Sequence, residues 1–161
     1  MQHGLRPEAS NFGLQLLFIL AVCFNPIWGI ITLALLIFKA TYLPFPPTAL
    51  GFEIAGAVGV YICEVLGVHF GKRGNLTEHV TALALGLGLL LVASAGQLYF
   101  MYFQTYVMML DLGLSATFLG MNGFCVIVGL VTLQNISAAG APASILAGKS
   151  GAVPPGAVKH D

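Results

Sequence analysis

Charged residues are scarce in this chain: only 7% of its 161 residues are Asp, Glu, Lys or Arg, while 58% are hydrophobic. An ordinary soluble domain carries about 25% charged residues. A compact soluble domain of this length could not cover its surface with so few charges. The composition therefore indicates an integral membrane protein, most of whose surface faces lipid.

The sequence also lacks the patterns of several function classes. Six basic and six acidic residues give a formal net charge of zero, so there is no basic field to attract nucleic acid. The three cysteines are far apart, with no CxxC pair and no metal-ligand spacing. No Ser-His-Asp arrangement, cysteine dyad or acid pair suited to an aqueous cleft is readable. We therefore expect no catalytic residue, no cofactor and no metal site.

Four apolar segments are long enough to cross a bilayer, which takes about 20 mostly apolar residues per helix. They cover residues 13–38, 48–70, 80–103 and 112–134. The predicted fold is an all-α membrane protein with four transmembrane helices and short connections, in a domain at residues 13–137. Residues 1–12 form an N-terminal segment. Residues 138–161 are rich in Ala, Gly and Pro and are predicted to be a disordered tail.

The basic residues predict the orientation of this domain. With four spans, both termini and the connection after the second span share one side of the membrane. The basic residues on that side are Arg6, Lys72, Arg73, Lys149 and Lys159, against Lys39 alone on the other side. The positive-inside rule therefore predicts that both termini and residues 71–78 lie in the cytosol.

The connection "GKRGNLTEHV", Gly71–Val80, also carries a glycosylation sequon at Asn75. We expect this sequon to be unused, because a cytosolic loop never meets the lumenal machinery. Gly71 is placed to end the second helix as a left-handed cap, and Asn75 with Glu78 resembles a capping box for the third helix. A second sequon, at Asn135, lies on the same side. A glycan on either Asn would reverse the predicted orientation.

Two acids in the second span are the strongest candidates for chemistry inside the membrane. Glu53 and Glu64 are eleven residues apart, which places them on one helix face about 16 Å apart. A buried acid in a membrane is by default a hypothesis of function, such as proton or ion coupling. The alternative, which we favour, is hydrogen bonding between helices, with Asn25, Gln97 or Asn122 as partner.

Small residues four apart predict close helix packing, either within the fold or between subunits. The pairs are Gly67-xxx-Gly71, Ala82-xxx-Gly86 and Ala84-xxx-Gly88.

Several short motifs follow one another in a recognisable order. After a Lys that ends the first span come "PFP" (Pro44–Pro46), a Glu late in the second span, "GKRGNL" (Gly71–Leu76) and "QTYV" (Gln104–Val107). With these motifs the chain, from Phe12 to Gln134, resembles the family of transmembrane proteins 17, 80 and 216, small four-span proteins of cilia. Asn25 falls where family members tend to carry an Asn in the first span. The other positions that match the family pattern are Glu64, Gly71, Gly74, Asn75, Leu76 and Gln104. The Gly-rich third span and the tail depart from the pattern and leave the subfamily open.

The resemblance implies a location and partners. The location is the ciliary transition zone, and the partners are Tectonic-type proteins and the membrane-embedded Meckel-syndrome module. That assembly helps to form a diffusion barrier in the membrane and supports cilium assembly. The family brings no catalytic residues, so none are carried over to this chain.

We therefore expect a non-enzymatic membrane scaffold subunit whose partners are the lipid bilayer and these proteins, with a second copy of the chain as a further candidate. Faces that contain Gly67 and Gly71 would dock neighbouring subunits, while Lys72 and Arg73 would meet anionic headgroups or an acidic partner. The alternative is a small homo-oligomeric transporter or channel, coupled to ions or protons through the acids of the second span.

Overall fold

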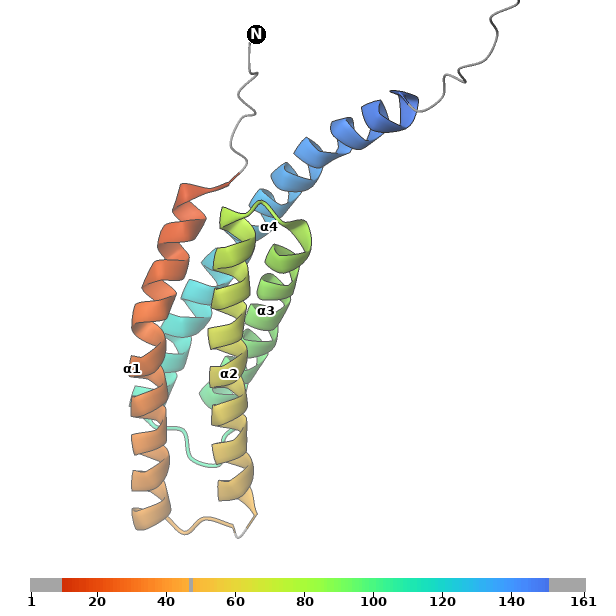
Figure 1. Cartoon of the computed structure of the whole chain (residues 1–161). Coiled ribbons are helices and arrows are strands. Elements are labelled where there is room, and N and C mark those ends of the chain that lie inside the picture. The colour runs from red at the N-terminus through yellow and green to blue at the C-terminus, as the bar shows by residue number, and fades with distance from the viewer. Residues whose placement is uncertain (1–9, 47, 151–161) are drawn as a thin grey trace, which may run out of the picture.

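The computed structural model describes residues 10–46 and 48–150, with side-chain surroundings up to Ala138. Within these residues the chain forms four helices. They are α1 (Phe12–Tyr42), α2 (Ala49–Leu76), α3 (Val80–Tyr102) and α4 (Met109–Ser150). The helices run alternately up and down and are joined by short connections (Figure 1). Each helix packs against the next in the chain, and α1 also packs against α4, so the four helices close a ring.

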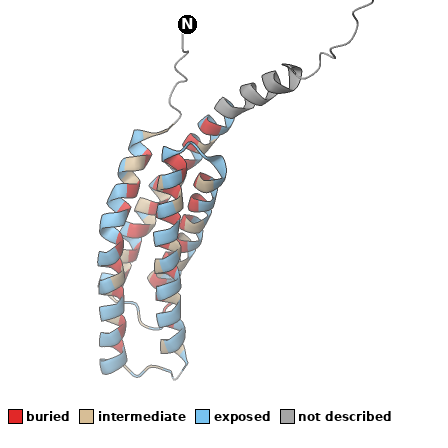
Figure 2. Ribbon diagram, in the orientation of Figure 1, coloured by how far each residue is buried: buried red, intermediate tan, exposed pale blue. Residues whose placement is uncertain are grey.

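All four helices are long and apolar enough to cross a membrane, α4 over Met109–Ala138. This confirms the predicted class of a four-span, all-α membrane protein. Buried residues lie along the faces that the helices turn toward one another, and exposed residues cover the outer faces (Figure 2). Many of the exposed side chains are large and apolar, Ile30, Ile37, Leu91 and Ile127 among them. An outer surface of this kind suits lipid rather than water.

The first helix begins and ends at identifiable residues. Asn11 is its N-cap, and its side chain accepts hydrogen bonds from the backbone N–H groups of the first turn. The helix continues to Tyr42, one turn past the predicted end of the span at residue 38, because the side chain of Lys39 is buried inside the bundle. Leu43 then leaves the helix in an extended conformation, as expected for a residue that precedes a proline.

The second helix is longer than predicted, and the prediction that Gly71 ends it as a left-handed cap is wrong. No glycine among the described residues has a positive φ, and α2 continues through Gly71 to Leu76. The capping box predicted for Asn75 is also wrong. His79 is the N-cap of α3, and Glu78 takes the left-handed conformation with φ 51°. A three-residue turn thus joins α2 to α3.

The fourth helix also extends past its predicted ends. It begins at Met109 rather than residue 112, with Asp111 in its first turn, and it continues to Ser150 rather than 134. Residues 138–150 of the predicted disordered tail are therefore helical. The rest of that tail, residues 151–161, and most of the N-terminal segment, residues 1–9, lie outside the described residues.

The interior contains two apolar clusters. One consists of Leu14, Phe18, Ala21, Val68, Leu83, Leu87, Leu90, Cys125 and Ile136. The other consists of Trp28, Leu36, Ala57, Val60, Ala93, Phe100 and Phe118. Along their helices, Asn25 on α1, Glu64 on α2 and Asn122 on α4 fall between the two clusters, and all three are buried. A polar layer therefore divides the apolar core.

Candidate functional site: the interhelix contacts of the motif residues

Glycines bring α2 and α3 into direct backbone contact. A Cβ atom added to Gly86 would overlap the backbone of Gly71, and one added to Gly74 would overlap the backbone of Leu83. A Cβ atom on Gly67 would lie 3.1 Å from the carbonyl oxygen of Gly86. The predicted pairs Gly67-xxx-Gly71 and Ala82-xxx-Gly86 therefore pack against each other within one chain.

This packing corrects the prediction that Gly67 and Gly71 dock neighbouring subunits. Both are buried, and a Cβ atom on Gly71 would also lie 2.5 Å from Cζ of Phe18 on α1. Neither glycine faces the outside of the bundle. The third pair differs, because Ala84 and Gly88 are exposed and a Cβ atom at Gly88 would meet open space.

Asn75 joins the end of α2 to the beginning of α1. Its Oδ1 accepts from the backbone N–H of Asn11 at 3.1 Å. Its Nδ2 donates to the Asn11 carbonyl at 3.1 Å and to Oε1 of Gln15 at 3.4 Å. Only 1% of Asn75 is exposed. Asn75, the Asn of the first sequon, is therefore buried and hydrogen-bonds α2 to α1.

Glu64 is hydrogen-bonded across the polar layer of the core. Its Oε2 accepts from Nδ2 of Asn122 at 2.9 Å, and both residues are fully buried. Of the alternatives weighed from the sequence, the bond between helices to Asn122 is confirmed. Asn25 lies in the same layer, 3% exposed, and its Oδ1 has no hydrogen-bond partner among the described residues.

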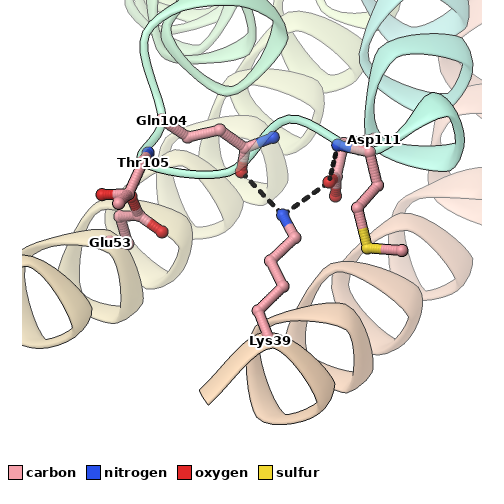
Figure 3. A network of polar contacts seen from close by, with 6 residues as sticks. Lys39, Glu53, Gln104, Thr105 and Asp111 are labelled. Atoms are coloured by element: carbon pink, nitrogen blue, oxygen red, sulfur yellow. Dashed lines mark hydrogen bonds and ion pairs between the residues drawn. The ribbon is translucent and has the colours of Figure 1, made fainter. Parts of the chain in front are cut away.

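At the opposite end of the bundle from Asn75, Lys39 is the centre of a second polar network (Figure 3). Its Nζ lies 2.5 Å from Oδ2 of Asp111 and donates to Oε1 of Gln104 at 3.1 Å. Oδ2 of Asp111 also accepts from the backbone N–H of Met108 at 3.1 Å. The network thus ties the end of α1 to the α3–α4 connection and to the first turn of α4.

Glu53 binds the same connection from α2. Its Oε1 accepts from the backbone N–H of Thr105 at 2.6 Å (Figure 3). The prediction that Glu53 and Glu64 lie on one face of the helix is confirmed, since both are completely buried on α2. Each acid is bonded to a different element: Glu53 holds the α3–α4 connection and Glu64 holds α4.

The motifs "PFP" and "QTYV" contact each other through one aromatic residue each. The hydroxyl of Tyr106 donates to the carbonyl oxygen of Pro44 at 2.8 Å. The ring of Tyr106 packs edge-on against Phe45, with ring centroids 5.1 Å apart. "PFP" in the α1–α2 connection and "QTYV" in the α3–α4 connection are therefore one contact, although about 60 residues separate them.

The remaining predicted site residues lie at the outer edge of the bundle. Lys72 is half-buried, while Arg73 and Leu76 are exposed on the last turns of α2. No ion pair or hydrogen bond of the Lys72 or Arg73 side chain to another described residue is found. These two cations are available to groups outside the chain.

Sequence reasoning missed Asp111 and Asn11 as contact residues. The sequence alone assigns no role to Asp111, although three charged side chains, those of Lys39, Glu53 and Asp111, come to one end of an up-and-down bundle. Opposite charges at one end of a membrane bundle are expected to pair. The topology therefore contained a signal for this network. For Asn11 the sequence holds no comparable signal, since its partner depends on where α2 ends.

Known proteins with related sequences were found. A family model described as "Predicted membrane protein" (Transmemb_17) matches residues 16–122, more than half of the chain. Transmembrane protein 216 of Danio rerio is 28% identical over 137 residues, which cover 85% of this chain and 86% of the relative. Transmembrane protein 216 of Homo sapiens is 25% identical over 128 residues, which cover 80% of this chain and 88% of the relative. No solved structure has significant similarity to the chain.

Proposed function

This chain belongs to the family of transmembrane proteins 17, 80 and 216, and we propose that it is a non-enzymatic scaffold subunit of the membrane at the ciliary transition zone. In this role it contributes to the membrane diffusion barrier and to cilium assembly. Its partners are Tectonic-type proteins and the membrane-embedded Meckel-syndrome module. Both termini face the cytosol, and a glycan on the exposed Asn135 would contradict that orientation.

The observation that supports a scaffold is that the polar motif residues form hydrogen bonds to other parts of the same chain. Lys39, Glu64, Asn75 and Gln104 each bond to another part of the same bundle. Substrate chemistry would need some of these polar groups free and accessible. Apart from the cations of Lys72 and Arg73, the chain offers other molecules an apolar outer surface and short connections, which suit lateral association with membrane proteins.

The outer face of α3 is the docking surface that this proposal selects. Ala84 and Gly88 lie on it, with Leu91 and Val92 exposed beside them at 55% and 59%. Small residues allow the backbone of a neighbouring helix to approach closely. Because Gly67 and Gly71 are used inside the bundle, this is the small-residue pair that remains free for a neighbour.

Co-purification from ciliated cells tests the proposal. The full chain, tagged at its native locus, should recover Tectonic-type proteins in mild detergent, and Gly88→Leu should lower that recovery. Gly59→Leu on α2 is the matched control, because Gly59 is also exposed and faces open space. Failure of the wild-type chain to recover any transition-zone protein would contradict the scaffold role. Equal recovery with the two variants would contradict α3 as the docking surface but would not contradict the scaffold role.

The alternative function is a homo-oligomeric transporter or channel that uses Glu53 and Glu64. One observation favours it: Oε1 of Glu64 and Oε2 of Glu53 have no hydrogen-bond partner among the described residues. Purified protein in liposomes should then carry a proton or ion flux that Glu64→Gln abolishes. A flux no greater than that of empty liposomes would exclude this alternative.

A further inference from the structure

A groove runs along the outside of the bundle between α1 and α2, and we call it the α1–α2 groove. It consists of two hollows that share Pro26 and Tyr61. The first hollow, nearer the α2–α3 turn, has a volume of about 410 Å³. The second hollow, farther from that turn and deeper in the membrane, has a volume of about 270 Å³. The two hollows follow each other along the two helices, with Pro26 and Tyr61 in the wall of both.

The groove has a basic mouth. Lys72 and His69 line the hollow nearer the α2–α3 turn, and neither has an ion pair with a described residue. No Asp or Glu is among the described residues that line either hollow. The mouth therefore has the charge that attracts an anion.

Below the mouth the walls are mainly apolar. Val22, Val65 and Val68 line the first hollow, and Ile30, Leu33 and Val58 line the second. From Lys72 to Val58 is 14 residues, about 21 Å of helix at 1.5 Å per residue. Half of the hydrocarbon core is about 15 Å thick. The groove is thus long enough for an acyl chain that enters from the leaflet on the Lys72 side.

The size of the groove favours a lipid over a protein helix. A helix about 10 Å across and 21 Å long would occupy roughly 1,600 Å³. That volume is more than twice what the two hollows hold together. An acyl chain is much thinner than a helix and fits a narrow path of this kind.

We propose that the α1–α2 groove binds one anionic phospholipid, with its phosphate at Lys72 and His69 and an acyl chain along the path to Leu33 and Val58. The occupant is a lipid of the leaflet that contains Lys72. This site does not depend on the ciliary function, because it rests only on the groove and its basic mouth.

Trp28 provides a built-in probe of the site. It is the only tryptophan of the chain, and it lines the second, deeper hollow. The full chain is reconstituted in phosphatidylcholine vesicles that contain the same small fraction of either phosphatidylserine or phosphatidylcholine with brominated acyl chains. Trp28 is only 1% exposed, but bromine quenches tryptophan over short distances, so an acyl chain seated in this hollow lies close enough to quench it. We therefore expect the brominated phosphatidylserine to quench Trp28 more strongly. Equal quenching by the two lipids would overturn the proposal.

Two substitutions separate a defined site from general attraction to a charged membrane. Lys72→Ala should reduce the preference for phosphatidylserine about fivefold, from the roughly 1 kcal/mol that a basic residue contributes near an anionic surface. Arg73→Ala is the matched control, because Arg73 is exposed and does not line the groove. If both variants lose the same preference, the attraction is diffuse and there is no defined site.

A third substitution tests the acyl path without changing charge. Val65→Phe should fill the first hollow and reduce quenching by both brominated lipids. Val131→Phe on the exposed face of α4 is its control and should leave quenching unchanged. Unchanged quenching in Val65→Phe would overturn the placement of the lipid in the groove.

Discussion

Nζ of Lys39 and Oδ2 of Asp111 lie 2.5 Å apart in a buried pair, with 0% and 6% of the two side chains exposed. The pair joins the last turns of α1 to the first turn of α4, which are far apart in the sequence. Gln104 supplies a further bond to the same ammonium group. A lysine that ends the first span is therefore an internal contact of the bundle, and it presents no free charge at that end.

Loss of one partner should leave the other charge buried and unpaired. Lys39→Met should lower the free energy of unfolding by about 3–5 kcal/mol, the usual cost of breaking a buried ion pair. Denaturant unfolding in detergent micelles measures the change. Arg73→Met removes a basic residue that is exposed and should have little effect. The double variant Lys39→Met/Asp111→Leu should recover much of the loss, and a double variant less stable than Lys39→Met would contradict this account.

The backbone contact between α2 and α3 should not tolerate a single added methyl group. Gly86→Ala should reduce the free energy of unfolding by about 1–3 kcal/mol, because the new Cβ overlaps the Gly71 backbone and the helices must separate. Gly88→Ala, two residues away on the same helix, adds the same methyl group in open space. Thermal unfolding of the two variants is compared directly, and equal midpoints would argue against the contact.

The bonds of Asn75 to the beginning of α1 should contribute to stability. Asn75→Ala leaves the backbone N–H of Asn11 without its partner, while the Asn11 carbonyl keeps its bond from the N–H of Gln15, at an expected cost of about 1–3 kcal/mol. Hydrogen exchange should then be faster in the first turns of α1. Asn135→Ala, at an exposed Asn in the other sequon, is the control. Protection in α1 that is the same in both variants would show that Asn75 does not hold this helix.

The bond between Glu64 and Asn122 can be measured with a double-mutant cycle. Glu64→Leu and Asn122→Leu, alone and combined, should give a coupling energy of about 0.6–2 kcal/mol, the range for hydrogen bonds between membrane helices. Independent effects of the two substitutions would mean that the bond contributes nothing. The same Glu64 variants can be used in the flux assay of the alternative function.

Composition and apolar segments predicted the four helices, because lipid requires long runs of apolar residues whatever their partners are. The ends of the helices were harder to predict. Gly71 has the sequence context of a helix cap, yet its lack of a side chain is needed for contact with α3, and only the tertiary structure decides between these uses. The end of α1 lies close to a sequence signal, since the helix stops at Tyr42, two residues before Pro44, and a proline restricts the residue before it.

The sequence predicted many of the residues that form the site, but it did not predict which contacts they make. Glu64, Asn75 and Gln104 were selected by motif, but a motif does not say which element each side chain meets. The pairings follow from the order in which the helices close the ring. That order brings the "PFP" and "QTYV" connections together at one end, and Asn11 and Asn75 together at the other.

Imaging of the full chain, tagged at its native locus in ciliated cells, tests the central claim most directly. The scaffold function predicts a narrow ring or spot just distal to a basal-body marker. Uniform signal in the plasma membrane or in internal membranes would contradict a transition-zone role.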